Sequence, residues 1–148
     1  MQEAQDAMSS GKPFAARAGV LRALQSAGAR VDEVAIRVER TRGAILMMSG
    51  EDDQLWGSTD LTAIAEERLK AAAFAYPFEH RRYPGAGHFA CLPPNLPATS
   101  TSARHGLVPM ALEYGGDAQN NARASADLWP RIVTFLLQHL ARKKTLGP

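Results

Sequence analysis

A short apolar run that ends at a glycine places the strongest constraint on the fold of this chain. Residues 44–49 read AILMMS and are followed by Gly50. Such a run between turn residues is typical of a strand that is buried on both faces, as in a parallel sheet. Residues 58–73 carry apolar side chains at the spacing of an amphipathic helix, and residues 78–83 form a second expected strand. Together they predict a right-handed βαβ unit with parallel strands.

The chain divides by composition into a short N-terminal segment and the remainder. Residues 1–13 are polar and are expected to form a loose segment, whereas residues 14–148 are expected to hold the folded domain. Helical spacing of apolar residues predicts a helix over 15–27, with Gly28 as its C-cap. Residues 35–38 alternate briefly and favour an extended conformation.

The C-terminal part contains a long segment without periodicity and a final helix. Residues 89–120 are rich in proline and glycine, and a loop of that length is usually functional or disordered. Residues 122–142 predict a helix, and Pro130 inside it predicts either a kink or a helix start nearby. Two clear strands do not make a domain. Further strands therefore lie in the long loop, or the chain is the end of a larger α/β protein.

Composition excludes several classes of protein. Hydrophobic residues make up 45% of the 148 residues and charged residues 22%, as in globular proteins. The net charge of +2 gives no case for nucleic-acid binding, and the one basic cluster, Arg142, Lys143 and Lys144, falls at an expected helix end. The single Cys91 excludes an intrachain disulfide and a cysteine-based zinc site. No apolar run approaches the ~20 residues of a membrane span. We expect a soluble cytoplasmic protein without a bound cofactor or metal, and without a nucleic-acid or membrane partner.

The two predicted strands bring acidic residues and a histidine to one edge of the sheet. Glu51, Asp52 and Asp53 follow the first strand, and His88 follows the second. Parallel neighbours lie ~4.8 Å apart and end at the same edge, so a carboxylate and an imidazole there can meet. A carboxylate fixes the tautomer of a histidine that acts as a base, and the order Asp then His completes the order Ser…Asp…His of α/β-hydrolases. The residues alone leave the alternatives of a helix-capping Asp52 and a surface His88 open.

Two competing motifs surround the histidine. Residues 85–90, GAGHFA, match a dinucleotide-binding fingerprint, but that motif requires a helix to begin there. The prolines that follow Leu92 exclude such a helix. Cys91 lies three residues from His88 and could be a nucleophile, but nothing around it resembles a sharp strand-to-helix elbow, and a free cysteine more often packs as a small hydrophobic residue.

Several longer segments carry a family resemblance. They read VERTRGAILMMSGEDDQLW (38–56), ERLKA (67–71), YPGAGH (83–88), LPPNLP (92–97), YGGDAQNNARASADLW (114–129) and FLLQHL (135–140). Over roughly residues 12–142 the chain resembles the C-terminal part of acyl-CoA thioester hydrolases and bile acid-CoA:amino acid N-acyltransferases.

The resemblance implies an α/β-hydrolase and a role for each of two residues. The family's G-x-x-D pattern starts at Gly50 and makes Asp53 the acid of the triad, with Asp52 as a neighbour, and its G-A-G-H pattern makes His88 the base. The chain departs from the family in one respect. It has no G-x-[SC]-x-G pentapeptide, and the accompanying oxyanion amides, the central strands and the N-terminal β-domain of the family are missing too. It is therefore expected to be a truncated gene product or one part of a split protein.

The expected fold class is α/β, the C-terminal part of an α/β-hydrolase fold with a parallel βαβ unit and flanking helices. The expected function is that of a C-terminal segment that contributes Asp53 and His88 to an acyl-CoA thioesterase or acyltransferase and is inactive alone. The substrate of the complete enzyme would be an acyl-CoA thioester, and the sequence does not choose between hydrolysis and conjugation. The alternative is a non-catalytic assembly module that pairs its sheet edge with a complementary chain or a second copy.

Overall fold

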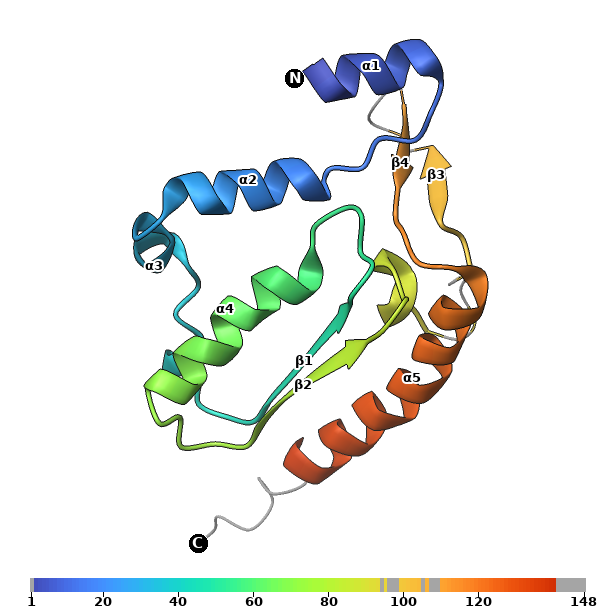
Figure 1. Cartoon of the computed structure of the whole chain (residues 1–148). Helices are drawn as coiled ribbons and strands as arrows, with labels where there is room; N and C mark the ends of the chain where they lie inside the picture. The colour runs from blue at the N-terminus through green and yellow to red at the C-terminus, as the bar shows by residue number, and fades with distance from the viewer. Residues whose placement is uncertain (1, 94, 96–98, 105, 107–109, 141–148) are drawn as a thin grey trace, which may run out of the picture.

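The computed structural model describes residues 2–93, 95, 99–104, 106 and 110–140. The predicted βαβ unit is confirmed: strand β1 (Ile45–Gly50), helix α4 (Ser58–Ala71) and strand β2 (Phe78–Tyr83) follow one another along the chain. The strands pair in parallel, with Ile45 opposite Phe78. Figure 1 shows α4 and the C-terminal helix flanking the two strands, which is an α/β arrangement.

The start of helix α4 is held by contacts with the end of β1 and not by a side-chain cap. Its N-cap is Gly57, in the left-handed region at φ +63°, and no side chain caps the helix. The hydroxyls of Ser58 and Thr59 instead reach back to the carbonyl of Gly50, at 3.3 and 3.2 Å. The start of α4 is therefore tied to the end of β1.

The segment before β1 is helical. Helix α2 (Arg17–Ala27) ends at Gly28, whose N–H donates to the carbonyl of Leu24 as predicted for a C-cap. The extended conformation expected for residues 35–38 is found at Ala35, at φ −62° and ψ +142°, but not at Arg37 or Val38. A short helix α3 (Arg30–Val34) precedes them, and a 3-10 turn η1 (Val38–Arg40) begins at the last of them. Among the described residues no strand pairs with this segment.

Helix α1 (Gln2–Ser10) occupies most of the segment that was expected to be loose. Its described side chains are largely exposed, so it adds little to the core. The division between residues 1–13 and 14–148 stays a prediction.

The predicted loop after β2 contains short elements. A 3-10 turn η2 (His88–Cys91) follows β2 directly, and strands β3 (Ser102–Arg104) and β4 (Ala111–Glu113) form a small antiparallel sheet. Helix α5 (Ala118–Leu140) begins earlier than expected and continues through Pro130, so a helix start at that residue is wrong. The basic residues 142–144 lie outside the described part of the chain.

The core is small and lies where α4, α5 and η2 meet the strands. Leu69 of α4 and Leu128 of α5 are fully buried, together with Ala86 and Ala90 after β2. The prediction that residues 44–49 are buried holds only for Ser49, because the other side chains of that run are half-buried. The parallel sheet has only two strands among the described residues. The side chains of β1 are therefore packed on some sides and open on others. No helix within the described ranges is long and apolar enough to cross a bilayer.

Candidate active site

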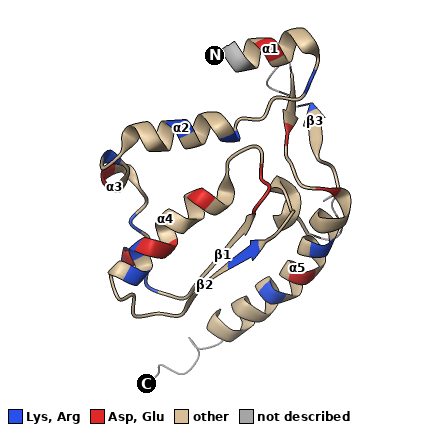
Figure 2. Ribbon diagram, viewed as in Figure 1, with Lys and Arg blue, Asp and Glu red and all other residues tan. Residues whose placement is uncertain are grey.

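The turn after β1 places a buried carboxylate at the sheet edge. A Cβ on Gly50 would collide with the backbone oxygens of Ala86 and Gly87, so the two strand-end loops approach each other as only glycine allows. The N–H of Asp53 donates to the Gly50 carbonyl, and the chain then turns toward α4. Figure 2 shows acidic residues at this position, directly after β1.

Asp53 is held by its own loop. Its Oδ1 accepts hydrogen bonds from the N–H groups of Leu55 at 2.9 Å and Trp56 at 3.1 Å. These bonds leave Oδ2 facing the loop that follows β2. The carboxylate is 1% exposed, so its position is fixed by contacts within the chain.

The loop after β2 presents the histidine. The N–H of Gly87 donates to Oδ1 of the buried Asn121 at 2.7 Å, and the N–H of His88 donates to the Tyr114 carbonyl at 2.8 Å. The ring of Tyr114 stacks on the imidazole, with 5.8 Å between ring centroids and 20° between planes. Two backbone bonds and one ring contact therefore orient His88.

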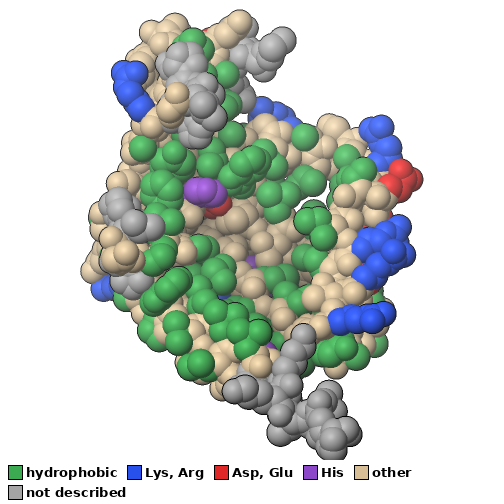
Figure 3. All heavy atoms as spheres, turned by 180° about the vertical axis from the view of Figure 1, so that it is seen from behind, with side chains coloured by type: hydrophobic (Ala, Val, Ile, Leu, Met, Phe, Trp, Pro, Cys, Tyr) green, Lys and Arg blue, Asp and Glu red, His purple; other side chains and the backbone are tan. Residues whose placement is uncertain are grey.

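The two predicted residues lie in direct contact. Nδ1 of His88 is 3.1 Å from Oδ2 of Asp53. Because a carboxylate can only accept, Nδ1 carries the proton and Nε2 is the ring nitrogen that remains for another group. The His88 side chain is 31% exposed. Figure 3 shows a face of the molecule on which hydrophobic side chains surround a histidine and an acidic group.

Hydrogen bonds keep Asp53 ionised in spite of its burial. Burial alone raises the pKa of this carboxyl, but bonds from His88, from the Trp56 amide and from Ser58 outweigh it, so the pKa lies below its ordinary value. A buried, ionised carboxylate next to a half-exposed imidazole stabilises an imidazolium when the ring accepts a proton at Nε2.

The glycine pair before α5 closes the site from the other side. Gly115 and Gly116 adopt φ of +72° and +69°, and a Cβ on Gly115 would collide with the backbone oxygen of Asp52. The N–H of Gly116 donates to Oδ2 of Asp52 at 2.9 Å. Asp52 therefore links the strand-end loop to the segment before α5, while its neighbour Asp53 faces the histidine.

Comparison with known proteins identifies the family of this chain. Residues 14–142 match the family described as BAAT / Acyl-CoA thioester hydrolase C terminal. The chain belongs to this family. The fold is accordingly the C-terminal part of its α/β-hydrolase domain, as predicted.

Curated relatives are acyl-CoA thioesterases. The chain is 36% identical over 105 residues to the peroxisomal succinyl-coenzyme A thioesterase of Mus musculus, covering 71% of this chain and 24% of that protein. It is 33% identical over 111 residues to acyl-coenzyme A thioesterase 6 of Homo sapiens, covering 75% and 26%. The chain thus spans about a quarter of the length of the curated relatives it matches.

Cys91 has the properties of a packed residue in this member of the family. Burial, with the nearby charge of Asp53, raises the pKa of its thiol to about 11. A thiol with that pKa is protonated near neutral pH, and the thiolate is the nucleophilic form. The geometry therefore disfavours the alternative in which Cys91 attacks a substrate.

Several residues that shape the site were not identified from the sequence. Tyr114 and Asn121 were noted only as part of a family segment, although one stacks on His88 and the other holds the Gly87 amide. The sequence feature that could have pointed to them is the glycine pair after Tyr114. Both glycines have positive φ, a conformation that favours glycine and allows a close approach of the backbone. Across the described residues, no three His, Cys, Asp or Glu side chains gather as a metal site requires.

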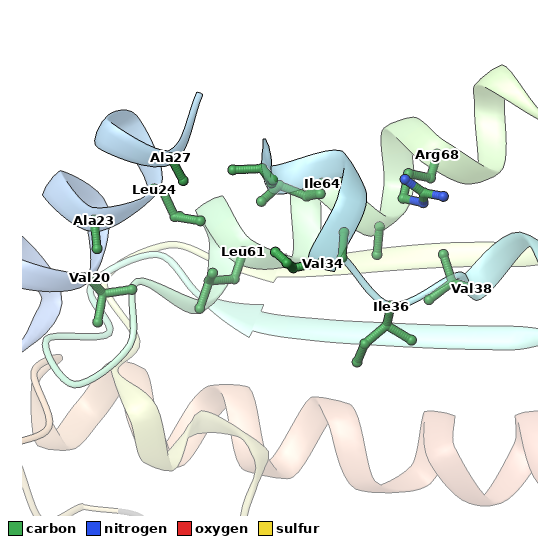
Figure 4. Close-up of a pocket in the computed structure, with 13 residues that line it drawn as sticks. Val20, Ala23, Leu24, Ala27, Val34, Ile36, Val38, Leu61, Ile64 and Arg68 are labelled. Carbon is green, nitrogen blue, oxygen red and sulfur yellow. The ribbon is translucent and has the colours of Figure 1, made fainter. Parts of the chain in front are cut away.

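A hydrophobic groove lies apart from the candidate site. It has a volume of about 540 Å³ and is formed by α2, α3, η1 and α4 (Figure 4). Its lining includes Val20, Leu24, Val34, Ile36, Leu61 and Ile64, with Arg68 at one end. Neither Asp53 nor His88 lines it, so the groove does not form part of the acid–base pair.

Proposed function

We propose that this chain contributes the acid and the base of a catalytic triad that acts on acyl-CoA thioesters, with Asp53 orienting His88. The observation that carries the proposal is the 3.1 Å contact between a buried carboxylate and a half-exposed imidazole at the ends of two parallel strands. In the complete site, Nε2 of His88 takes the proton of a nucleophile as that nucleophile attacks the thioester carbonyl. The same proton then passes to the departing thiolate.

The nucleophile comes from outside these 148 residues. No G-x-[SC]-x-G occurs in the sequence, and the thiol of Cys91 is held protonated. An acid–base pair alone could activate water, but it would lack oxyanion donors, each of which contributes ~10²–10³ in rate. The acceptor decides the reaction: water gives hydrolysis, and an amine gives conjugation.

The first experiment measures thiol release from acyl-CoA substrates of several chain lengths by the purified chain. We expect background rates, unchanged by Cys91→Ser. Robust turnover that disappears in His88→Ala would show that the chain contains its own nucleophile, and would contradict the proposal.

A chimera tests the roles of the two residues. This chain would replace the matching quarter of human acyl-coenzyme A thioesterase 6, to which it is 33% identical. We expect thioesterase activity that falls by ~10⁴ in Asp53→Asn, because the imidazole loses its orienting carboxylate. Asp52→Asn is the matched control, since its side chain binds the Gly116 amide and not His88. Equal losses in both variants would contradict the assignment of Asp53.

The second candidate is an assembly module. It is favoured by a parallel sheet of two strands among the described residues and by exposed apolar side chains on α5, where Leu137 and Leu140 are each 67% exposed. Sheet edges and apolar faces of this kind pair with another chain. Two measurements distinguish an assembly module from a catalytic segment. In sedimentation of the purified chain, an assembly module forms a dimer or a mixed complex. In the chimera, an assembly module remains inactive.

A further inference from the structure

A serine–histidine–carboxylate chain of hydrogen bonds, separate from the Asp53–His88 pair, lies inside the βαβ unit. Oγ of Ser49 on β1 is 2.8 Å from Nε2 of His80 on β2, and Nδ1 of His80 is 2.9 Å from Oε2 of Glu66 on α4. In the strand register Ser49 lies opposite Arg82 and not His80, so the contact is diagonal across the sheet. Three elements of the fold thus meet in one line of hydrogen bonds.

The distances are those of a catalytic triad, but burial excludes that role. Ser49 is 1% exposed, and so is the side chain of His80. No substrate carbonyl can reach a hydroxyl that α4 covers. The chain of bonds must therefore act on something within the protein.

Charges around Glu66 fix the direction of the bonds. Hydrogen bonds from Lys70 and His80 lower the pKa of Glu66 to about 2, with a further bond from Arg82, so the carboxylate is ionised and accepts. Nδ1 of His80 then carries the proton, and Nε2 accepts from the hydroxyl of Ser49. The oxygen of Ser49 in turn accepts from the hydroxyl of Thr59 at 2.9 Å. Nε of Arg82 also lies 3.3 Å from Nδ1 of His80, and because that nitrogen carries a proton it accepts no hydrogen bond from Arg82.

The line of bonds ends at the turn that carries Asp53. The single hydroxyl hydrogen of Thr59 is shared between Oγ of Ser49 and the carbonyl oxygen of Gly50, which is 3.2 Å away, and the hydroxyl of Ser58 lies 3.3 Å from the same carbonyl oxygen. That carbonyl accepts the N–H of Asp53. The buried serine and histidine are therefore connected, through the start of α4, to the backbone that places the acidic residue.

We propose that Ser49, His80 and Glu66 form a positioning network that holds the turn of Asp53 at the distance His88 requires. The inference rests on the proposed function, in which Asp53 orients His88. None of the three residues touches a substrate; each acts through the geometry of the Gly50–Asp53 turn.

Amide hydrogen exchange of the folded chain tests this role. The amides of Leu55 and Trp56 report on Asp53, since both donate to its carboxylate, and the amide of Gly87 reports on the opposite loop. In Thr59→Val we expect exchange at Leu55 and Trp56 to rise by about tenfold or more, with Gly87 unchanged, because only the Asp53 turn loosens. Thr59→Ser keeps the hydroxyl and should restore protection.

Matched variants separate positioning from general stability. Thr62→Val makes the same change one turn along α4, outside the network, and should leave all three amides unchanged. Ser49→Ala should repeat the effect of Thr59→Val. Equal acceleration of all three amides in Thr59→Val and Ser49→Ala would show a purely structural role and overturn the inference, as would no change at all.

A spectroscopic signal keeps the inference separate from the proposed function. A low-field imidazole N–H resonance, assigned by its loss in His88→Ala, marks the bond between His88 and Asp53. We expect it in the unmodified chain and expect it to weaken in Ser49→Ala. Its absence from the unmodified chain would contradict the acid–base pair, and the positioning role with it. Its persistence at full strength in Ser49→Ala would overturn only the positioning role.

Discussion

Two imidazole–carboxylate pairs lie in and next to the βαβ unit, and they have nearly the same geometry but opposite burial. His88 and Asp53 lie 3.1 Å apart, with the imidazole 31% exposed and the carboxylate 1% exposed. His80 and Glu66 lie 2.9 Å apart, with the imidazole 1% exposed and the carboxylate 16% exposed. In the first pair the histidine ring reaches the surface, whereas in the second pair only the carboxylate of Glu66 does.

This difference teaches how one arrangement of side chains can serve two purposes. A base must exchange a proton with a group outside the fold, so its imidazole must be accessible. A buried imidazole cannot do so, but it can connect strand and helix, because each of its nitrogens has a partner. Local geometry alone is therefore insufficient to propose a catalytic role, which also requires an accessible ring.

The largest effect is expected at Gly50, which lies between the two pairs. In Gly50→Ala the new Cβ meets backbone oxygens of Ala86 and Gly87, which cannot move as a side chain can. We expect a loss of about 3 kcal/mol or more in the free energy of unfolding. Urea denaturation measures it.

The control is Gly43→Ala, where an added Cβ meets nothing within 4 Å. It should change the free energy of unfolding by less than about 0.5 kcal/mol. Equal effects at the two glycines would mean that the strand-end loops are not packed as described.

A somewhat smaller effect is expected from removing the buried imidazole. His80→Ala leaves the hydroxyl of Ser49 and the carboxylate of Glu66 without their partner and opens a cavity. We expect the free energy of unfolding to fall by about 2 to 4 kcal/mol. The measurement is the midpoint of urea unfolding at neutral pH. The slope of the free energy of unfolding against urea concentration should stay unchanged.

The exposed imidazole should matter much less for stability. In His88→Ala the carboxylate of Asp53 keeps its bonds from Leu55 and Trp56, so only one partner is lost. We expect a fall of about 1 kcal/mol in the free energy of unfolding. A loss in His88→Ala as large as that in His80→Ala would remove the distinction between the accessible and the buried histidine.

The first of these pairs could be predicted from the sequence because its contacts follow from topology. Residues 44–49 and 78–83 are recognisable as strands by composition, and parallel strands end at one edge, which brings Asp53 and His88 together. Chain direction alone does not distinguish Asp53 from Glu51 and Asp52, and the choice of Asp53 rests on the family's G-x-x-D pattern.

The second pair could not be predicted, because it depends on register and on how a helix rests on a sheet. Nothing in the spacing of Ser49, His80 and Glu66 specifies a diagonal contact, and His80 is one of six residues in a polar strand. The segment at 35–38 is extended only at Ala35 for a related reason. Its alternation favours a strand, but in the described part of the chain no strand pairs with it, and it ends in a 3-10 turn.

The smallest expected effect is the acid dependence of stability, and it again separates the two pairs. The pKa of Glu66 is lowered from 4.5 to about 2 in the folded chain by Lys70, His80 and Arg82. As the pH falls below the ordinary value, the unfolded chain takes up a proton before the folded chain does. The stabilisation is therefore complete above about pH 4.5 and is lost progressively toward pH 2. Urea midpoints measured between pH 6 and pH 2, on the order of one pH unit apart, should fall over this window.

In Glu66→Gln the fall should be shallower, because one of the carboxyl groups whose pKa is lowered in the folded chain is gone. Glu67→Gln is the matched control on the same helix. The side chain of Glu67 is 71% exposed and forms an ion pair with Lys70, but it forms one with neither His80 nor Arg82. The fall in urea midpoint with pH should therefore remain in this variant. Asp53→Asn should also make the fall shallower, since the pKa of Asp53 is likewise lowered in the folded chain. If Glu67→Gln flattened the curve as much as Glu66→Gln, the carboxylate next to His80 would have no special place in the fold, and the contrast between the two pairs would rest on exposure of the imidazoles alone.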